Sequence, residues 1–143
     1  MKLTLKNNQL TTLSTILERV QPKNMKANRG RAKLIAKVQE KFTEYYQDES
    51  DILKEYCEAD EHGQIVSDGA GGLKLKDPDK LAEVRQLQSE LSEEEITLEA
   101  GEYASRYKAF FDWLAEAEDD FSATEVILID DLLEQYEGGT DGL

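Results

Sequence analysis

The sequence predicts an α+β fold of about five helices, one of them long, with a small antiparallel sheet and a β-hairpin. Three observations lead to this fold class. Apolar residues recur every three or four positions over several long stretches, which is typical of amphipathic helices. Two short stretches alternate apolar and polar residues, as half-buried strands do. A turn rich in glycine separates two further short apolar pairs, which indicates a hairpin.

The chain begins with a predicted strand and helix. "KLTLK" at residues 2–6 alternates Leu3 and Leu5 with polar residues, which suits a short half-buried strand. Asn7 or Asn8 then offers a helix cap. Pro22 and the polar run "QPKNMKANRG" end this first helix. Its buried face is predicted at Leu10, Leu13, Ile16, Leu17 and Val20.

A long helix is predicted over residues 31–58, from about Arg31 to Glu58. Its main apolar stripe is broken once, at Glu49, and its breadth suits a helix that lies on a globular core. The stripe consists of Ile35, Val38, Phe42, Tyr45, Ile52 and Tyr56, and it is widened by Leu34, Tyr46, Leu53 and Cys57.

A β-hairpin is predicted at residues 64–76, where "SDGAGG" separates the pair Ile65-Val66 from Leu73 and Leu75. Asp and Gly tolerate the positive φ angles that hairpin turns demand. The next helix begins at Asp77-Pro78, with Asp as the cap and Pro at the first helical position. Its buried face is predicted at Leu81, Val84, Leu87 and Leu91.

The last third holds a predicted strand and two helices. "EEITLEA" alternates at Ile96 and Leu98, and this strand is a candidate partner for the N-terminal strand. Ser122 and Glu125 have the spacing of a capping box and open the fifth helix. The fourth helix is aromatic, with Tyr103, Tyr107, Phe110, Phe111 and Leu114. The fifth is lined by Val126, Ile129, Leu133 and Tyr136, and Gly138-Gly139 closes it. The predicted core is Ile35, Val38, Phe42, Tyr107, Phe110, Phe111, Leu114 and Ile129.

The length of 143 residues suits one domain, predicted at residues 1–138, with residues 139–143 as a flexible tail. No internal repeat is evident. The one cysteine can form no internal disulfide. No apolar run has the length of a signal peptide or the roughly 20 residues of a membrane span. We therefore expect a cytoplasmic protein without a membrane association, with the virion as the alternative location.

The stretch "CEADEHGQIVSDG" at residues 57–69 is similar to a calcium loop, because Glu58, Asp60 and His62 alternate. Position 12 of such a loop needs a bidentate Glu, yet it holds Gly69. A single Cys and a single His are too few for a typical zinc site. Cys57 with His62 as base lacks a third orienting group. We therefore expect a turn here, with no metal and no catalytic thiol.

Other chemistry finds little support. The chain has no glycine-rich phosphate-binding motif, since "GAGG" lacks the lysine and the following helix. Asp119, Asp120, Asp130 and Asp131 could hold Mg²⁺, but no motif that reads a substrate accompanies them. The sequence therefore predicts a protein that is not an enzyme and needs no cofactor.

Charge is distributed unevenly. Residues 1–47 hold 10 Lys+Arg and 3 Asp+Glu, a net of +7, and the remainder holds 7 and 28, a net of −21, which gives the total of −14. One interpretation is solubility, together with complementarity between the two halves. The other is a charged macromolecular partner.

Two charged clusters are the candidate binding residues. The basic one could grip phosphates, although no aromatic residue is interleaved for base stacking. The acidic one could imitate the charge of a phosphate backbone and occupy a nucleic-acid groove on a target protein. The basic cluster is Lys23, Lys26, Arg29, Arg31, Lys33 and Lys37. The acidic cluster is Glu116, Glu118, Asp119, Asp120, Asp130 and Asp131.

The order of these pieces, with phrases such as "KEYCEADEHG", "DPDK" and "EITLEAGEY", resembles a family of small uncharacterised proteins encoded by phages and prophages of Gram-positive bacteria. The likeness covers most of the chain. It implies an intracellular role in the bacterial host and transfers no functional residues. The leading hypothesis is a module that binds a host or phage protein without catalysis, in its most concrete form an acidic inhibitor of a host or defence protein. A virion-assembly accessory and direct nucleic-acid binding are the alternatives.

Overall fold

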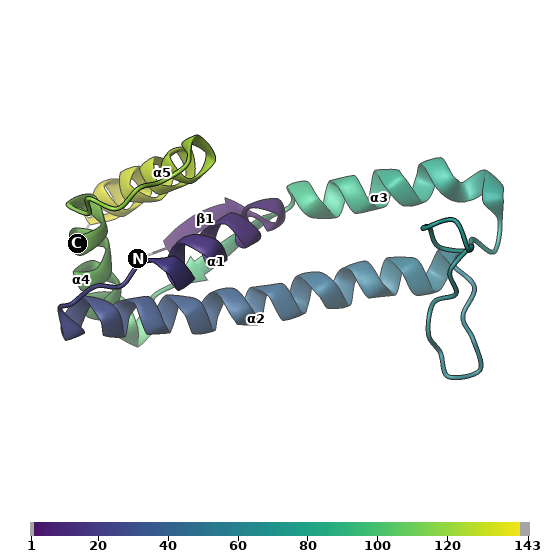
Figure 1. The fold of residues 1–143 in the computed structure, drawn as a ribbon, viewed down its shortest axis with the longest axis horizontal. Coiled ribbons are helices and arrows are strands. Elements are labelled where there is room, and N and C mark those ends of the chain that lie inside the picture. The colour runs from purple at the N-terminus through teal and green to yellow at the C-terminus, as the bar shows by residue number, and fades with distance from the viewer. Residues whose placement is uncertain (1, 141–143) are drawn as a thin grey trace. The chain divides into compact units, whose positions relative to one another are not determined.

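The computed structural model describes residues 2–140 and has the predicted α+β fold (Figure 1). Single turns of 3₁₀ helix at Asn7–Gln9, Pro78–Lys80 and Gly101–Tyr103 precede α1, α3 and α4. Within the described residues the elements are β1 (Lys2–Lys6), α1 (Leu10–Arg19), α2 (Met25–Tyr56), α3 (Leu81–Glu93), β2 (Glu95–Glu99), α4 (Ala104–Ala115) and α5 (Ala123–Thr140).

The contacts divide the chain into two compact units. The first combines the residues up to Phe42 with those from Glu95 onward, and the second is Thr43–Glu94. Helix α2 contributes to both. The single domain at residues 1–138 stays a prediction, since compact units within one chain can belong to one cooperative domain. Helix α5 continues to Thr140, beyond its predicted end at Gly138-Gly139, and residues 141–143 of the predicted tail lie outside the described residues.

The sheet of the first unit confirms the predicted pairing of the two alternating stretches. Strands β1 and β2 are antiparallel, with Lys2 opposite Glu99 and Lys6 opposite Glu95. Leu3, Leu5 and Leu98 are buried on the inner side. Oppositely charged residues face one another at both ends of the ladder, which fixes the register along with the apolar alternation.

Helix α5 covers the free edge of β1 through one side chain. The Thr4 N–H donates to Gln135 Oε1 at 2.7 Å, and Gln135 Nε2 donates to the Thr4 carbonyl at 2.8 Å. The amide therefore takes the place of a neighbouring strand at this position. An edge strand with unpaired backbone groups invites association, and this contact removes one such pair.

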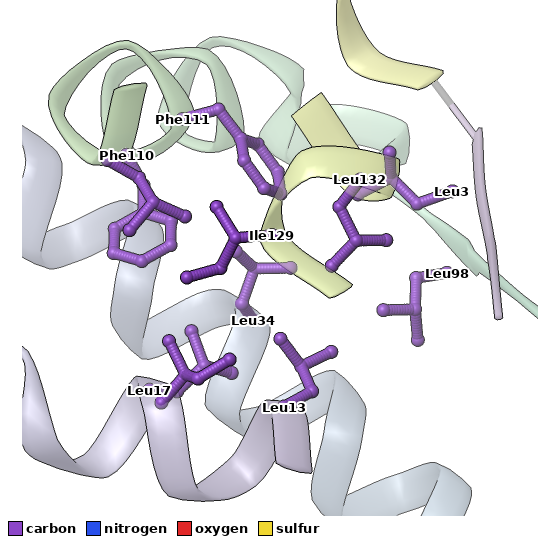
Figure 2. Close-up of a pocket in the computed structure, with 11 residues that line it drawn as sticks. Leu3, Leu13, Leu17, Leu34, Leu98, Phe110, Phe111, Ile129 and Leu132 are labelled. Atoms are coloured by element: carbon purple, nitrogen blue, oxygen red, sulfur yellow. The ribbon is translucent and has the colours of Figure 1, made fainter. Parts of the chain in front are cut away.

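The core of the first unit lies where α1, α2, α4, α5 and the sheet meet. Six of the eight predicted core residues are buried there: Val38, Tyr107, Phe110, Phe111, Leu114 and Ile129. The remaining gap measures about 10 Å³, room for about one water molecule at most, so this is a packed core and not a ligand cavity. Figure 2 shows the side chains that converge on it: Leu3, Leu13, Leu17, Leu34, Leu98, Phe110, Phe111, Ile129 and Leu132.

The predicted burial of Ile35 and Phe42 is wrong, because both are half-buried. The buried stripe of α2 is rotated by one position and runs through Ala27, Gly30, Leu34 and Val38. Ile35 lies on its flank. Phe42 is the last residue of α2 that belongs to the first unit.

Helix α2 begins at Met25, six residues before its predicted start at Arg31. Asn24 caps it, since its Oδ1 accepts from the Lys26 N–H at 2.8 Å. Gly30 was interpreted as part of the break between helices, but it lies inside α2. A Cβ atom there would come within 1.9 Å of the Arg106 carbonyl oxygen on α4, so glycine permits close approach of the two helices.

Residues 57–76 of the second unit differ from the regular hairpin that the sequence predicts. Isolated antiparallel bridges join Cys57 with Leu75, Ala59 with Ile65, and Ser67 with Leu73. At the centre, three backbone N–H groups donate in a closed ring: Glu58 to the Lys74 carbonyl at 2.8 Å, Lys74 to Val66 at 2.8 Å, and Val66 to Glu58 at 2.9 Å. Each short extended piece therefore pairs with the other two.

Two similar turns connect these pieces. Asp60 Oδ1 accepts from the N–H groups of residues 62 and 64 at 2.8 and 2.9 Å. Asp68 Oδ1 accepts from those of residues 70 and 72 at 2.7 and 3.0 Å. Gly63 and Gly71, with φ of 78° and 86°, supply the positive φ that each turn requires. The two turns therefore share one local geometry, in which an Asp is followed three positions later by a Gly.

Candidate functional site

The calcium-like stretch contains a turn at Asp60, whose carboxylate accepts hydrogen bonds from the backbone. Asp60 accepts two N–H groups, and Glu58 Oε2 lies 3.0 Å from Lys74 Nζ. His62 is exposed and lies beside Glu61, with 3.7 Å between Nε2 and Oε1. Within residues 2–140 no group of three or more His, Cys, Asp or Glu side chains is arranged to hold a metal ion.

Cys57 has the environment of a packing residue. It is buried, and burial raises the pKa of its thiol, an effect that the positive charge of Lys76 opposes only in part. A reactive thiol needs a lowered pKa and access to solvent. The side chain of Cys57 therefore contributes to the interior of the second unit, beside Leu53 and Val84.

The basic cluster is divided between internal contacts and solvent. Arg31 donates from Nε and Nη2 to the carbonyls of Leu17 and Glu18, the last turn of α1, and from Nη1 to Asn28. Such contacts satisfy helix-end carbonyls and favour a cation near the C-terminal dipole. Arg31 therefore has a structural role, and its predicted role in binding stays a prediction.

Two further cations of the basic cluster also have partners on the first unit. Lys33 Nζ lies 4.5 Å from the centroid of the Tyr103 ring, and Lys37 pairs with Glu40 at 3.3 Å. The exposed remainder is Lys23, just before α2, and Lys26 and Arg29 in its first turns. Half of the cluster is thus engaged within the molecule, which leaves a small cationic surface of three residues.

The acidic cluster is exposed throughout. Glu116, Glu118, Asp119 and Asp120 lie at the end of α4 and in the connection to α5. Asp130 and Asp131 lie on the outer side of α5, where Asp131 Oδ2 accepts from Gln135 Nε2 at 3.0 Å. In the described part of the chain, none of these six carboxylates lies in an ion pair. After Lys108 the sequence contains eleven Asp+Glu and no Lys or Arg.

The beginning of α5 is built as predicted. Ser122 and Glu125 form a reciprocal capping box, with the Ser122 N–H donating to Glu125 Oε1 at 2.8 Å and the Glu125 N–H to Ser122 Oγ at 3.2 Å. Arg19 Nη2 also donates to Glu125 Oε1, at 2.9 Å. This bond and the Ser122 backbone lower the pKa of the Glu125 carboxyl. Glu125 is therefore a structural acid, distinct from the exposed cluster.

The rest of α5 carries its charges against the helix dipole. Carboxylates stabilise a helix near its N-terminus and destabilise it near its C-terminus, by about 0.3–1 kcal/mol each. Glu134 and Glu137 lie toward the C-terminal end, and the last turn has no basic residue. The effect is greatest for Glu137, at the beginning of the last turn, because the influence of the dipole falls off within one turn.

The structure also identifies surface residues that the sequence did not reveal. Val126, predicted to line the buried face, is 50% exposed, and its neighbour Ile127 is 70% exposed. The buried stripe of α5 instead runs through Leu128, Ile129, Leu132 and Tyr136. The segment "VILIDDLL" contains too many apolar residues to define a single face. Beside Ile127, a hollow of about 130 Å³ is lined by Gln9, Thr12, Thr124 and Leu128.

The comparisons with known proteins identify the family. A family model described as a protein of unknown function (DUF1617) matches residues 1–143. The chain belongs to this family. No curated protein and no solved structure matches it. Across residues 2–140, no helix has the length and apolar character needed to cross a bilayer.

Proposed function

We propose that this DUF1617 protein is a protein-binding module without catalytic activity that engages a basic surface of its target through acidic residues of the α4–α5 region. The observation that carries the proposal is the exposed set Glu116, Glu118, Asp119, Asp120, Asp130 and Asp131, which is free of internal ion pairs among the described residues. Opposite charges across an interface steer association and select partners.

In its most concrete form the module is an acidic inhibitor encoded by a phage or prophage of a Gram-positive bacterium. It acts in the host cytoplasm on a host or defence protein that normally binds nucleic acid. Carboxylates held at fixed positions on α5 imitate a run of phosphates, and the target's cationic groove is then occupied. The acidic half of the chain, with its net charge of −21, supports this form.

Pull-down from host lysate followed by mass spectrometry identifies the partner, and charge reversal tests the surface. We expect reversal of Glu116, Glu118, Asp119 and Asp120 to Lys to abolish capture of that partner. A matched variant reverses four exposed acids of the second unit (Asp48, Glu55, Glu90 and Glu94) and is expected to retain it. Raising the salt concentration to several times 0.1 M should weaken binding, since exposed charges are screened over about 10 Å at 0.1 M.

The opposite outcomes point to different functions. Capture that survives the first reversal and high salt would contradict an electrostatic interface. Recovery of tail or head proteins of a virion would favour an assembly role. Binding of duplex DNA by the purified chain, lost when Lys23, Lys26 and Arg29 are reversed, would favour direct nucleic-acid binding.

A further inference from the structure

The outward side of α5 begins with an apolar surface that no part of the first unit covers. Val126 and Ile127 are 50% and 70% exposed. The adjoining hollow of about 130 Å³ lies between α5 and the beginning of α1, with the buried Leu128 among its lining residues. Thr12 and Thr124 also line it. The hollow is open and has room for one aliphatic side chain from outside.

Carboxylates continue this surface along the helix. Asp130, Asp131 and Glu134 follow Ile127 at three, four and seven positions, so they lie on the same side of α5. All three are exposed. The surface therefore runs from an apolar end to an acidic end over about two turns. A helix packed along α5 would contact this stripe at the same three- and four-residue spacing.

We propose that Val126, Ile127, Asp130, Asp131 and Glu134 form a docking face for a basic amphipathic helix of the partner protein. One aliphatic side chain of that helix enters the hollow beside Ile127, and Lys or Arg side chains follow over the three carboxylates. This inference rests on the proposed function and names the segment that the partner presents.

Charge selects this occupant over two others. Nucleic acid would bring phosphates against three carboxylates. A second copy of the chain related by a two-fold axis would bring the same acidic face against itself, and each copy carries a net charge of −14. A cationic helix, in contrast, offsets the mutual repulsion of the three carboxylates.

The first test uses three synthetic peptides of about five helical turns: a Leu/Lys amphipathic helix, its Leu/Glu counterpart, and a Lys-containing helix with Ala in place of Leu. Each is titrated into the ¹⁵N-labelled full chain. We expect the Leu/Lys peptide to shift the amides of Thr12, Thr124 and Ile127 and to bind more tightly than both others. Larger shifts at other surfaces, or equal binding of all three peptides, would overturn the proposal.

Variants separate the apolar anchor from general charge attraction. Ile127→Ser should weaken the Leu/Lys peptide about tenfold, as truncation of an interface anchor does. Met25→Ser removes another exposed apolar side chain of the first unit, 66% exposed, and should leave the affinity unchanged. Neutralising Asp130, Asp131 and Glu134 should reduce the salt dependence, whereas neutralising Asp48, Glu55 and Glu90 should not. Equal effects of each variant and its control would contradict the docking face.

The partner captured from lysate distinguishes this inference from the broader function. Loss of that partner on reversal of Glu116, Glu118, Asp119 and Asp120, with full retention in Ile127→Ser, would leave the proposed function standing and overturn the docking face. Loss in both variants, with shifts at α5 when the partner's own basic helix is titrated as a peptide, would support both.

Discussion

Replacing Gly30 by alanine tests the close approach of α2 and α4. In an open helix this change stabilises, because alanine is better than glycine by about 1 kcal/mol in helix propensity. At Gly30 the added Cβ would lie 1.9 Å from the Arg106 carbonyl oxygen, 2.8 Å from its carbonyl carbon and 2.9 Å from Phe110 Cβ. The first two are backbone atoms, which cannot rotate away as a side chain can.

The size of the effect follows from these distances. An ordinary contact begins at 3.4 Å, so the Arg106 carbonyl must retreat by about 1.5 Å (3.4 less 1.9). That shift moves Phe110, which is buried in the core of the first unit. Overpacking of this kind costs up to about 3 kcal/mol. After the gain in propensity of about 1 kcal/mol, we expect Gly30→Ala to lower the free energy of unfolding by about 2 kcal/mol.

Urea unfolding gives the measurement, with two probes. The single tryptophan, Trp113, lies in α4 and reports on the first unit by fluorescence, and far-ultraviolet circular dichroism reports on the helices. Gly138→Ala is the matched control, because a Cβ there meets nothing within 4 Å on α5, and it should stabilise by up to about 1 kcal/mol. If Gly30→Ala proved as stable as the unchanged chain, the helix contact would be wrong.

Three further predictions concern single side chains. Gln135→Ala should lower the free energy of unfolding by about 1–3 kcal/mol, because the Thr4 N–H and carbonyl lose their partner; an unchanged urea midpoint would contradict the bonds to the strand edge. Glu125 has a lowered carboxyl pKa, so its stabilisation is present above its usual value of 4.5 and is lost as pH falls through the lowered one. Arg19→Ala, which removes the largest cause, should flatten that acid dependence, and an unaltered acid-unfolding profile would refute it. The thiol of Cys57 should react slowly with a disulfide reagent in the native protein and rapidly in denaturant, whereas rapid native reaction would show that it is exposed.

Local rules predicted much of the fold. Alternation identified β1 and β2 and their pairing, because a one-residue slip would move the buried Leu3, Leu5 or Leu98 to the solvent face. The aromatic face of α4 was also predictable, because large apolar residues at helical spacing define one buried side of a helix. The capping box at Ser122 involves residues three positions apart, so its hydrogen bonds can be predicted without the tertiary structure.

Features that depend on neighbouring elements were not predictable from local patterns. In the sequence alone, a glycine such as Gly30 indicates the end of a helix. It lies inside α2 because the Arg106 backbone of α4 comes too close for a side chain at this position. On α5 every position from 126 to 133 is apolar except the two aspartates, so periodicity alone could not decide which face is buried. The contact of Gln135 with β1 spans 131 positions of the chain, and no local signal marks it.

The sequence identified the charged residues of the candidate site but not the apolar surface beside them. The six acidic residues are exposed as expected, but Ile127 and the hollow beside it emerge only once α1 and α5 are packed together. The basic cluster shows the reverse, because Arg31, Lys33 and Lys37 have contacts within the first unit that a list of charges cannot reveal.

Part of the uneven charge of the chain is paired within the first unit, and part is exposed to solvent. Arg19 pairs with the buried Glu125, and Lys2 lies 3.6 Å from Glu99, so two basic residues of the N-terminal part meet acids of the C-terminal part. If internal complementarity explained the whole asymmetry, the acids after Lys108 would be matched in the same way. The acidic cluster is not, because none of its six carboxylates lies in an ion pair among the described residues. Solubility alone would not require exposed Val126 and Ile127 next to them. The coincidence of uncompensated charge, an uncovered apolar pair and an adjoining hollow on one helix is what a docking surface needs, and it singles out α5 as the first place to mutate.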